Sequence, residues 1–440
     1  MELPSPQSTK RYKIYEPGNL RLLSSFLHHT KLNKPINQLA ISVSDQAAVS
    51  AGNFLTIALG ANLLPLEEQG KLIYIYAIYI AMVLFNVSAF FSSANTVRNE
   101  IDSTGCYQRL LLKAQLISAA LTSILLAGSL FVFHAAIKWQ LTGNELIALL
   151  IFLLLQQIAD FYRRSGYIFK HIKMSTLSSF WLYGIRISGL LYFRPNNLLE
   201  FLSVMIIPIV PIALFALEDY RRNRNITCDS AIKRNLIQMH LGLSKWSICN
   251  APFKWAGLHS PILLVGVLHS IEAAAILGTI RALTTFANVL LELLETFIPA
   301  WLVSKAVHGN HVLRKSSLYL LGIGAVVWGL GFCVILIFGK AVIYYVLDSA
   351  YIAYSNILYI LWMGSGIYFL SRTISLHYRT KKNTWLELMG SIIGAFTLLA
   401  TLPLITLYGA WGGAWCLVIV QSAMLTSMLI YRTVRIRYAK

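Results

Sequence analysis

The residues best suited to chemistry in this sequence are ionisable side chains inside long apolar stretches. One group shares a single face of a helix at roughly 100° per residue: Arg281, Asn288, Glu292, Glu295 and Pro299. Ionisable groups within a membrane are costly and usually face a cavity or a partner, so this stripe predicts a binding or coupling surface. A structural interpretation stays open, because the same stripe suits a seam of hydrogen bonds between helices.

Two other apolar segments carry polar groups of this kind. Arg186 lies in the middle of its segment, within Tyr183–Gly189, where its side chain cannot reach either surface and needs an anion or a water-filled cavity. In the first apolar segment, Asp45 shares a helix face with Gly52, and Asn53 flanks that face. Asp45 is a candidate cation ligand, with an ion pair or a helix cap as equal alternatives.

The motifs of metal, cofactor and nucleophile sites are missing from the sequence. The five cysteines have no CxxC spacing, which indicates neither a disulfide framework nor a zinc site, and the loop His308–His311 has no acidic or thiol ligands beside it. There is no Walker A loop, no GxGxxG after a strand and no GxSxG. We therefore expect no metal, no cofactor and no enzymatic reaction.

The elements that must position the polar residues are membrane-spanning helices. Hydrophobic residues make up 57% of the 440 positions and charged residues 12%, which is more apolar than one soluble core needs. A span takes about 20 mostly apolar residues. The expected spans are 39–63, 72–95, 114–137, 144–162, 176–193, 198–217, 248–268, 271–299, 316–339, 355–376, 384–406 and 408–431. The predicted fold is an all-α polytopic membrane protein of about 12 transmembrane helices.

Basic residues predict the orientation of these helices in an inner membrane. The net charge is +19, and Lys and Arg cluster in alternate loops, as the positive-inside rule requires. The loops expected outside carry only Lys71, Lys138, Arg194 and Lys340. Both termini are therefore expected in the cytoplasm. Nucleic acid is not an expected partner, because the basic residues fall in short clusters and not on one amphipathic face.

The longest basic loop divides the apolar segments into two sets of six around a central cavity, a common plan for transporters. Within that loop, 232–246 has the apolar and basic spacing of an interfacial helix. The expected domains are a cytosolic basic tail at 1–38, a six-helix bundle at 39–217, a basic linker at 218–247, a second six-helix bundle at 248–431 and a cytosolic tail at 432–440.

Two stretches resemble the oligosaccharide flippases, the O-antigen and exopolysaccharide translocases of the multidrug/oligosaccharidyl-lipid/polysaccharide exporter superfamily. They are Ser44–Leu55 with Leu63–Gly70, and Ile276–Leu283 continued to Pro299. The resemblance implies two bundles that open alternately to either side of the membrane around a cationic cavity. It implies a polyprenyl-diphosphate-linked oligosaccharide as the substrate. The expected partners are membrane lipid, a polysaccharide polymerase and a chain-length regulator.

The resemblance also suggests roles for the polar residues. Arginine suits the diphosphate, because its planar fork holds phosphate through two hydrogen bonds and stays charged when desolvated. The candidates for substrate binding are Arg186, Arg281, Asn288 and Asn53, and those for cation coupling or gating are Asp45, Glu292 and Glu295.

Two other functions compete with this interpretation. A cation-coupled multidrug exporter of the same superfamily shares the architecture, but a cavity for organic cations favours acidic groups over buried arginines. A membrane glycan polymerase or ligase usually needs a sizeable outer loop with acid, base or arginine groups. The longest outer loop here, about 340–354, offers only Lys340 and Asp348 as charged groups.

Overall fold

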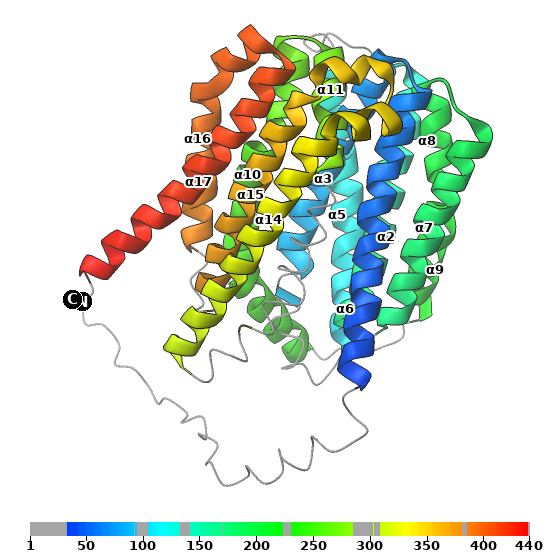
Figure 1. The fold of residues 1–440 in the computed structure, drawn as a ribbon. Helices are drawn as coiled ribbons and strands as arrows, with labels where there is room; N and C mark the ends of the chain where they lie inside the picture. The colour runs from blue at the N-terminus through cyan, green and yellow to red at the C-terminus, as the bar shows by residue number, and fades with distance from the viewer. Residues whose placement is uncertain are drawn as a thin grey trace.

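The computed structural model describes residues 33–91, 93–94, 104–132, 141–169, 171–222, 230–284, 302, 309–380 and 385–438. Within these ranges every regular element is a helix, which confirms the all-α fold class. In chain order they are α2 (Asn33–Leu63), α3 (Leu66–Asn86), the π-helix η2 (Val87–Phe91), α5 (Thr104–Val132), α6 (Gly143–Ile168), α7 (Ile172–Phe193), α8 (Leu198–Ile206), α9 (Ile209–Arg222), α10 (Ser230–Leu268), α11 (Ile271–Leu283), α14 (Asn310–Val346), the 3-10 helix η6 (Ser349–Tyr354), α15 (Asn356–Arg379), α16 (Trp385–Tyr408) and α17 (Ala410–Tyr438). Figure 1 shows the long helices side by side, running in roughly the same direction.

The number of helices agrees with a polytopic membrane fold. Eight stretches of the described chain are long and apolar enough to cross a membrane, and the pair α8 and α9, bent by 42°, makes a ninth. Pro208 lies at that bend, where proline cannot continue the helical hydrogen bonding. With α2, α7 and the described part of α11, these helices match the twelve expected spans one for one.

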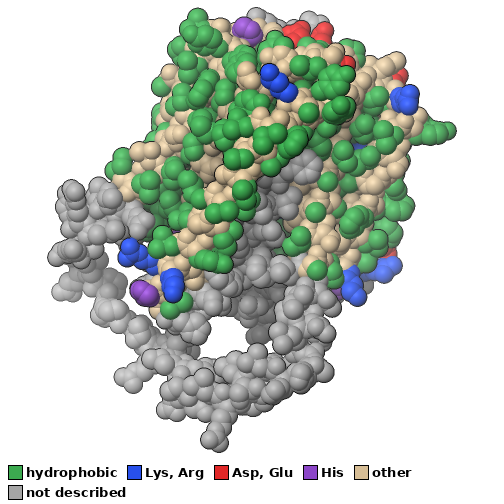
Figure 2. Space-filling view, viewed as in Figure 1, with side chains coloured by type: hydrophobic (Ala, Val, Ile, Leu, Met, Phe, Trp, Pro, Cys, Tyr) green, Lys and Arg blue, Asp and Glu red, His purple; other side chains and the backbone are tan. Residues whose placement is uncertain are grey.

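The surface has the pattern that a membrane requires. In Figure 2 hydrophobic side chains cover the side of the bundle, while most charged side chains lie toward its two ends. Large apolar side chains such as Leu125, Ile337 and Phe396 are exposed on the helices. A soluble protein would rarely expose so much apolar surface, whereas lipid covers it without penalty.

The helices pack as two bundles joined in the middle. In the first half α2 packs on α7, and α6 packs on α5, α7, α8 and α9. In the second half α16 packs on α10 and α17, and α15 packs on α14 and α17. Helix α3 contacts both α10 and α11, and α11 also contacts α2. The space between the halves is therefore bordered by α2, α3, α10 and α11.

The segment between the halves differs from the expectation. The stretch predicted as a separate interfacial helix is continuous with the seventh span, because α10 runs without a break for 39 residues. Its first turns pack on the other half, where Leu236 joins an apolar cluster. The ring of His240 is 2.8 Å from the Tyr107 hydroxyl and 2.7 Å from the Ala89 carbonyl oxygen. Helix α10 thus links the two bundles.

The cysteines also differ from the expectation in one respect. Three of those described are free thiols: Cys249, Cys333 and Cys416. Cys106, near the start of α5, is disulfide-bonded. The spacing of the cysteines in the sequence did not indicate this bond.

Candidate substrate cavity

A cavity of about 300 Å³ lies between the two halves of the bundle. Helices α2, α3, α6 and α7 line it from the first half, and α10, α11, α15 and α17 line it from the second. Of the residues predicted to bind substrate, Asn53 and Arg281 lie on its wall. The ionisable groups on that wall, apart from tyrosines, are Asp160, Arg163, Arg164, Lys254, His259 and Arg281.

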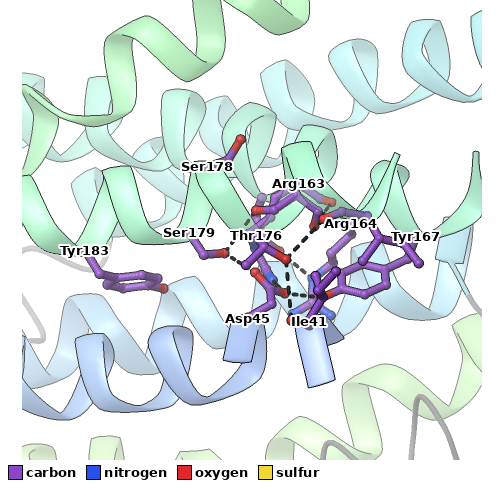
Figure 3. A network of polar contacts seen from close by, with 12 residues as sticks. Ile41, Asp45, Arg163, Arg164, Tyr167, Thr176, Ser178, Ser179 and Tyr183 are labelled. Atoms are coloured by element: carbon purple, nitrogen blue, oxygen red, sulfur yellow. Dashed lines mark hydrogen bonds and ion pairs between the residues drawn. The ribbon is translucent and has the colours of Figure 1, made fainter. Parts of the chain in front are cut away.

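The charges of the first half form an ion-pair network on α6 and α2 (Figure 3). Arg163 binds two carboxylates, with Nη1 2.9 Å from Oδ2 of Asp45 and Nη2 2.9 Å from Oδ1 of Asp160. Nε of Arg164 lies 2.9 Å from Oδ2 of Asp160. The i, i+3 and i+4 spacing on α6 places Asp160 beside both arginines. Two carboxylates face two guanidinium groups, so the formal charges of this network cancel.

Asp45, a candidate for cation coupling, is fully buried within this network. The Tyr167 hydroxyl donates to Oδ2 of Asp45 at 2.5 Å, and the Ser179 hydroxyl donates to Oδ1. Both carboxylate oxygens are therefore occupied by protein donors. The sequence left three alternatives for Asp45, namely a cation ligand, an ion pair and a helix cap. In this structure Asp45 forms the ion pair. A role in cation coupling stays a prediction, and it requires the pair with Arg163 to open.

The charges of the second half are arranged differently. Nη1 of Arg281 on α11 donates to the Leu258 carbonyl oxygen on α10 at 2.6 Å. Among the described residues that backbone oxygen is its one hydrogen-bond partner, and none of their carboxylates pairs with it. The charges of Arg281 and Lys254 both act on the ring of His259. This wall therefore gathers two positive charges around one imidazole.

Uncharged polar side chains line the cavity along α2: Gln46, Ser50 and Asn53. Their i, i+4 and i+7 spacing places them on one face of the helix. The hydroxyl of Tyr183, on α7, donates to Oδ1 of Asn53 at 3.1 Å. Gly52 permits this approach, because a Cβ atom there would lie 2.2 Å from the Tyr183 ring. The glycine noted in the sequence thus has a packing role beside Asn53.

Arg186, predicted to bind substrate, lies behind this wall. It is 1% exposed and is not among the described residues that line the cavity. Its Nη2 donates to Oε1 of Gln156 at 2.8 Å, and its guanidinium carbon is 5.2 Å from the centre of the Tyr183 ring. Gln156 in turn donates to the Tyr79 hydroxyl at 3.4 Å. Arg186 therefore supports two tyrosines of the cavity wall, and direct contact with substrate stays a prediction.

The remaining candidates lie outside the described residues. They are Asn288, Glu292 and Glu295, so the predicted polar stripe is described only at Arg281. Two cavity residues were missed by the sequence analysis. Lys254 falls within the expected span 248–268 but was not singled out there, and a single histidine such as His259 forms no motif. Only the packing of α10 against α11 brings both residues to Arg281.

Helices of the first half contact helices of the second half at one end of the molecule, the end opposite the first turn of α2. Nε2 of Gln69, near the start of α3, donates to the Thr279 hydroxyl of α11 at 2.9 Å. Nδ2 of Asn62 donates to the Val346 carbonyl oxygen, also at 2.9 Å. These contacts join first-half helices to second-half helices. They hold the two bundles together at this end in the conformation described.

Comparison with known proteins identifies the fold of the chain but no closely related sequence. No protein-family model and no curated protein sequence matches the chain. An inward-facing multidrug resistance MATE family transporter of the MOP superfamily aligns with a TM-score of 0.61 at 13% identity, covering 91% of this chain and 95% of that one. The lipid II flippase MurJ, in an inward closed conformation, aligns with a TM-score of 0.63 at 13% identity, covering 90% and 87%.

A third solved structure is a MOP superfamily transporter from Pyrococcus furiosus that has a binding pocket of reverse polarity. It aligns with a TM-score of 0.53 at 13% identity, covering 91% of this chain and 92% of that one. All three alignments extend over about nine tenths of this chain. The chain therefore has the fold of the MOP-superfamily transporters.

Proposed function

We propose that this chain is a flippase that moves a polyprenyl-diphosphate-linked oligosaccharide repeat unit from the cytoplasmic to the periplasmic leaflet. The product would serve the synthesis of a surface polysaccharide, such as O-antigen or exopolysaccharide. One observation carries the proposal: in the cavity of a MOP-type fold, Lys254 and Arg281 form a cationic wall around His259, and Arg281 has no carboxylate partner among the described residues. The likeness to MurJ supports a flippase at the level of the fold.

The cationic wall has the chemistry that a diphosphate needs. Arg281 uses one N–H group on a backbone oxygen and has others left for a phosphate. Guanidinium and phosphate pair through two parallel hydrogen bonds, and this pairing strengthens where water is excluded. Positive charge inside a membrane is costly without an anion, so the same wall that binds the diphosphate is itself stabilised by it.

An exporter of organic cations is less well supported by the cavity. Such a substrate needs a carboxylate that is not already neutralised. Asp160 is the one carboxylate among the described residues that line the cavity, and both Arg163 and Arg164 pair with it. A glycan polymerase or ligase is disfavoured by the fold, which is that of transporters.

The two-bundle fold is consistent with transport by alternating access. The bundles hold together at the end of Gln69 and Thr279, so substrate release requires those contacts to separate. A ligand drives this change only if it binds the two states differently. In the proposal Asp45, Glu292 and Glu295 serve cation coupling or gating.

The protein would lie in the bacterial inner membrane with both termini cytoplasmic and the basic segment 218–247 on the cytoplasmic side. Its partners would be membrane lipid, a polysaccharide polymerase and a chain-length regulator. Asn288, Asn53 and Arg186 complete the proposed substrate-binding set, with Arg186 acting through the tyrosines that it supports.

Deleting the protein tests the function directly. Synthesis of the lipid-linked oligosaccharide precedes its flipping, so the deletion should leave this lipid made but held on the cytoplasmic leaflet. Lipid extracts and surface glycan are compared between the deletion strain, the parent and a strain with the gene restored. Unchanged surface polysaccharide, in a strain without a second flippase, would count against the proposal.

A further inference from the structure

The two walls of the cavity differ in chemistry, and we infer that they divide the substrate between them. The second-half wall of Lys254, His259 and Arg281 holds the diphosphate. The polar stripe of α2, formed by Gln46, Ser50 and Asn53, binds the sugars next to it. This inference rests on the proposed function and adds the position and chemical class of the glycan.

The polar stripe on α2 contains side-chain groups that have no hydrogen-bond partner among the described residues. Gln46 is 5% exposed and Ser50 is 9% exposed, and both line the cavity. Neither side chain has a hydrogen-bond partner among the described residues, and Asn53 uses only its oxygen, on the Tyr183 hydroxyl. Amide and hydroxyl groups that line a cavity and are not used by protein partners can bind a polar ligand.

The ligand that fits this wall is an uncharged sugar. Amide and hydroxyl groups can donate and accept hydrogen bonds, which matches the hydroxyl and acetamido groups of sugars. The ring of Tyr183 lies beside the stripe, and Arg186 supports that ring from behind. An aromatic ring beside polar groups offers an apolar face to the C–H groups of a sugar ring.

Charge assigns the diphosphate to the opposite wall. The first-half arginines are paired with carboxylates, since Arg163 binds Asp45 and Asp160, and Arg164 binds Asp160. A diphosphate there would compete with two carboxylates. Arg281 has no carboxylate partner among the described residues, so it can bind an anion without breaking an ion pair. The glycan is thereby left facing α2.

Binding measurements with two lipids separate the walls. The protein and its variants are placed in nanodiscs, and dissociation constants are measured for polyprenyl diphosphate without sugar and for lipid-linked oligosaccharide purified from the deletion strain. Gln46→Ala, Ser50→Ala and Asn53→Ala should each weaken binding of the glycan-bearing lipid by about three- to tenfold, since each removes one polar contact. Binding of the sugarless lipid should not change.

Two variants serve as references. Ser44→Ala is the matched control for Ser50→Ala, because Ser44 lies on the same helix, is exposed and bonds to its own backbone at Ala40, with 2.9 Å between the oxygens. It should bind both lipids as the parent does. Arg281→Ala should weaken binding of both lipids by the same factor, because both carry the diphosphate.

The outcomes distinguish this inference from the function on which it rests. If the α2 variants weaken both lipids equally, or leave the glycan-bearing lipid unaffected, the division between the walls is wrong while the function stands. If the parent protein binds neither lipid, the proposed function fails and the inference fails with it. Selective loss of the glycan-bearing lipid supports the inference.

Discussion

Arg163 and Arg281 line the same cavity from opposite halves, and their partners differ. Arg163 spans two carboxylates, Asp45 and Asp160, at 2.9 Å each. Arg281 reaches one backbone oxygen, of Leu258, and pairs with no carboxylate among the described residues. A guanidinium group with its charge balanced fixes the helices that carry its partners. One without such balance is available to an anionic ligand, so we assign Arg163 a structural role in one wall and propose a binding role for Arg281 in the other.

The largest expected effect is a loss of stability when Arg163, the arginine with the structural role, is replaced. Arg163→Ala leaves Asp45 buried without its cation, and breaking a buried pair in this way costs about 3–5 kcal/mol. The amount of inserted protein and its thermal unfolding temperature in detergent should both fall sharply. Arg164→Ala is the matched control, because Asp160 keeps Arg163 as a partner in that variant. Equal stability of Arg163→Ala and the parent would refute the structural role.

Removing both members of a pair sharpens the same comparison. In Asp45→Leu with Arg163→Met neither charge of the pair remains, so the double variant should be more stable than Arg163→Ala. Thermal unfolding of Asp45→Leu, Arg163→Met, the double variant and the parent gives the interaction energy of the Asp45–Arg163 pair. Transport by the double variant then tests the other role proposed for Asp45. A stable double variant that keeps ion-coupled transport would exclude a role of Asp45 in coupling.

Packing on the first-half wall gives a smaller effect. Gly52→Ala would place a methyl group 2.2 Å from the Tyr183 ring, so the ring must move away from Asn53. Overpacking of this kind costs about 1–3 kcal/mol. Thermal stability and transport per inserted molecule should both decrease. Gly184→Ala is the control on the helix of Tyr183, because nothing lies within 4 Å of the added atom, and it should be neutral or slightly stabilising.

The smallest expected effect is a loss of stability at low pH, and it comes from the buried histidine His240. Burial lowers the pKa of His240, and its hydrogen bond to the Ala89 carbonyl only partly opposes this. The unfolded chain binds a proton near pH 6.5, so the folded state loses stability as the pH falls from there toward the lowered pKa. The loss is at most about 1.4 kcal/mol per pH unit. Between pH 7.5 and 5.5 the parent should lose more thermal stability than His240→Gln, and equal losses would contradict this.

The sequence supports the prediction of helices better than that of their contacts. Apolar segments of sufficient length and the alternation of basic loops predicted each span. Asn53 and Arg281 could be singled out as polar positions on apolar helices, and the structure places both on the cavity wall. Arg186 had the same pattern but lies behind the wall, because periodicity does not tell which neighbour a helix face meets. The ion pair of Asp45 joins residues 118 positions apart, which no local pattern reveals.

Transport by variants at Arg281 tests the central claim most directly. Transport of lipid-linked oligosaccharide is measured per molecule of membrane-inserted protein for the parent, Arg281→Lys and Arg281→Ala. Lysine keeps the charge and loses the planar fork, so Arg281→Lys should retain part of the activity, whereas Arg281→Ala should abolish it at normal insertion. A structural seam would lower the amount of protein and spare the activity of each molecule. If normally inserted Arg281→Ala moves substrate at the parental rate, Arg281 does not bind the diphosphate.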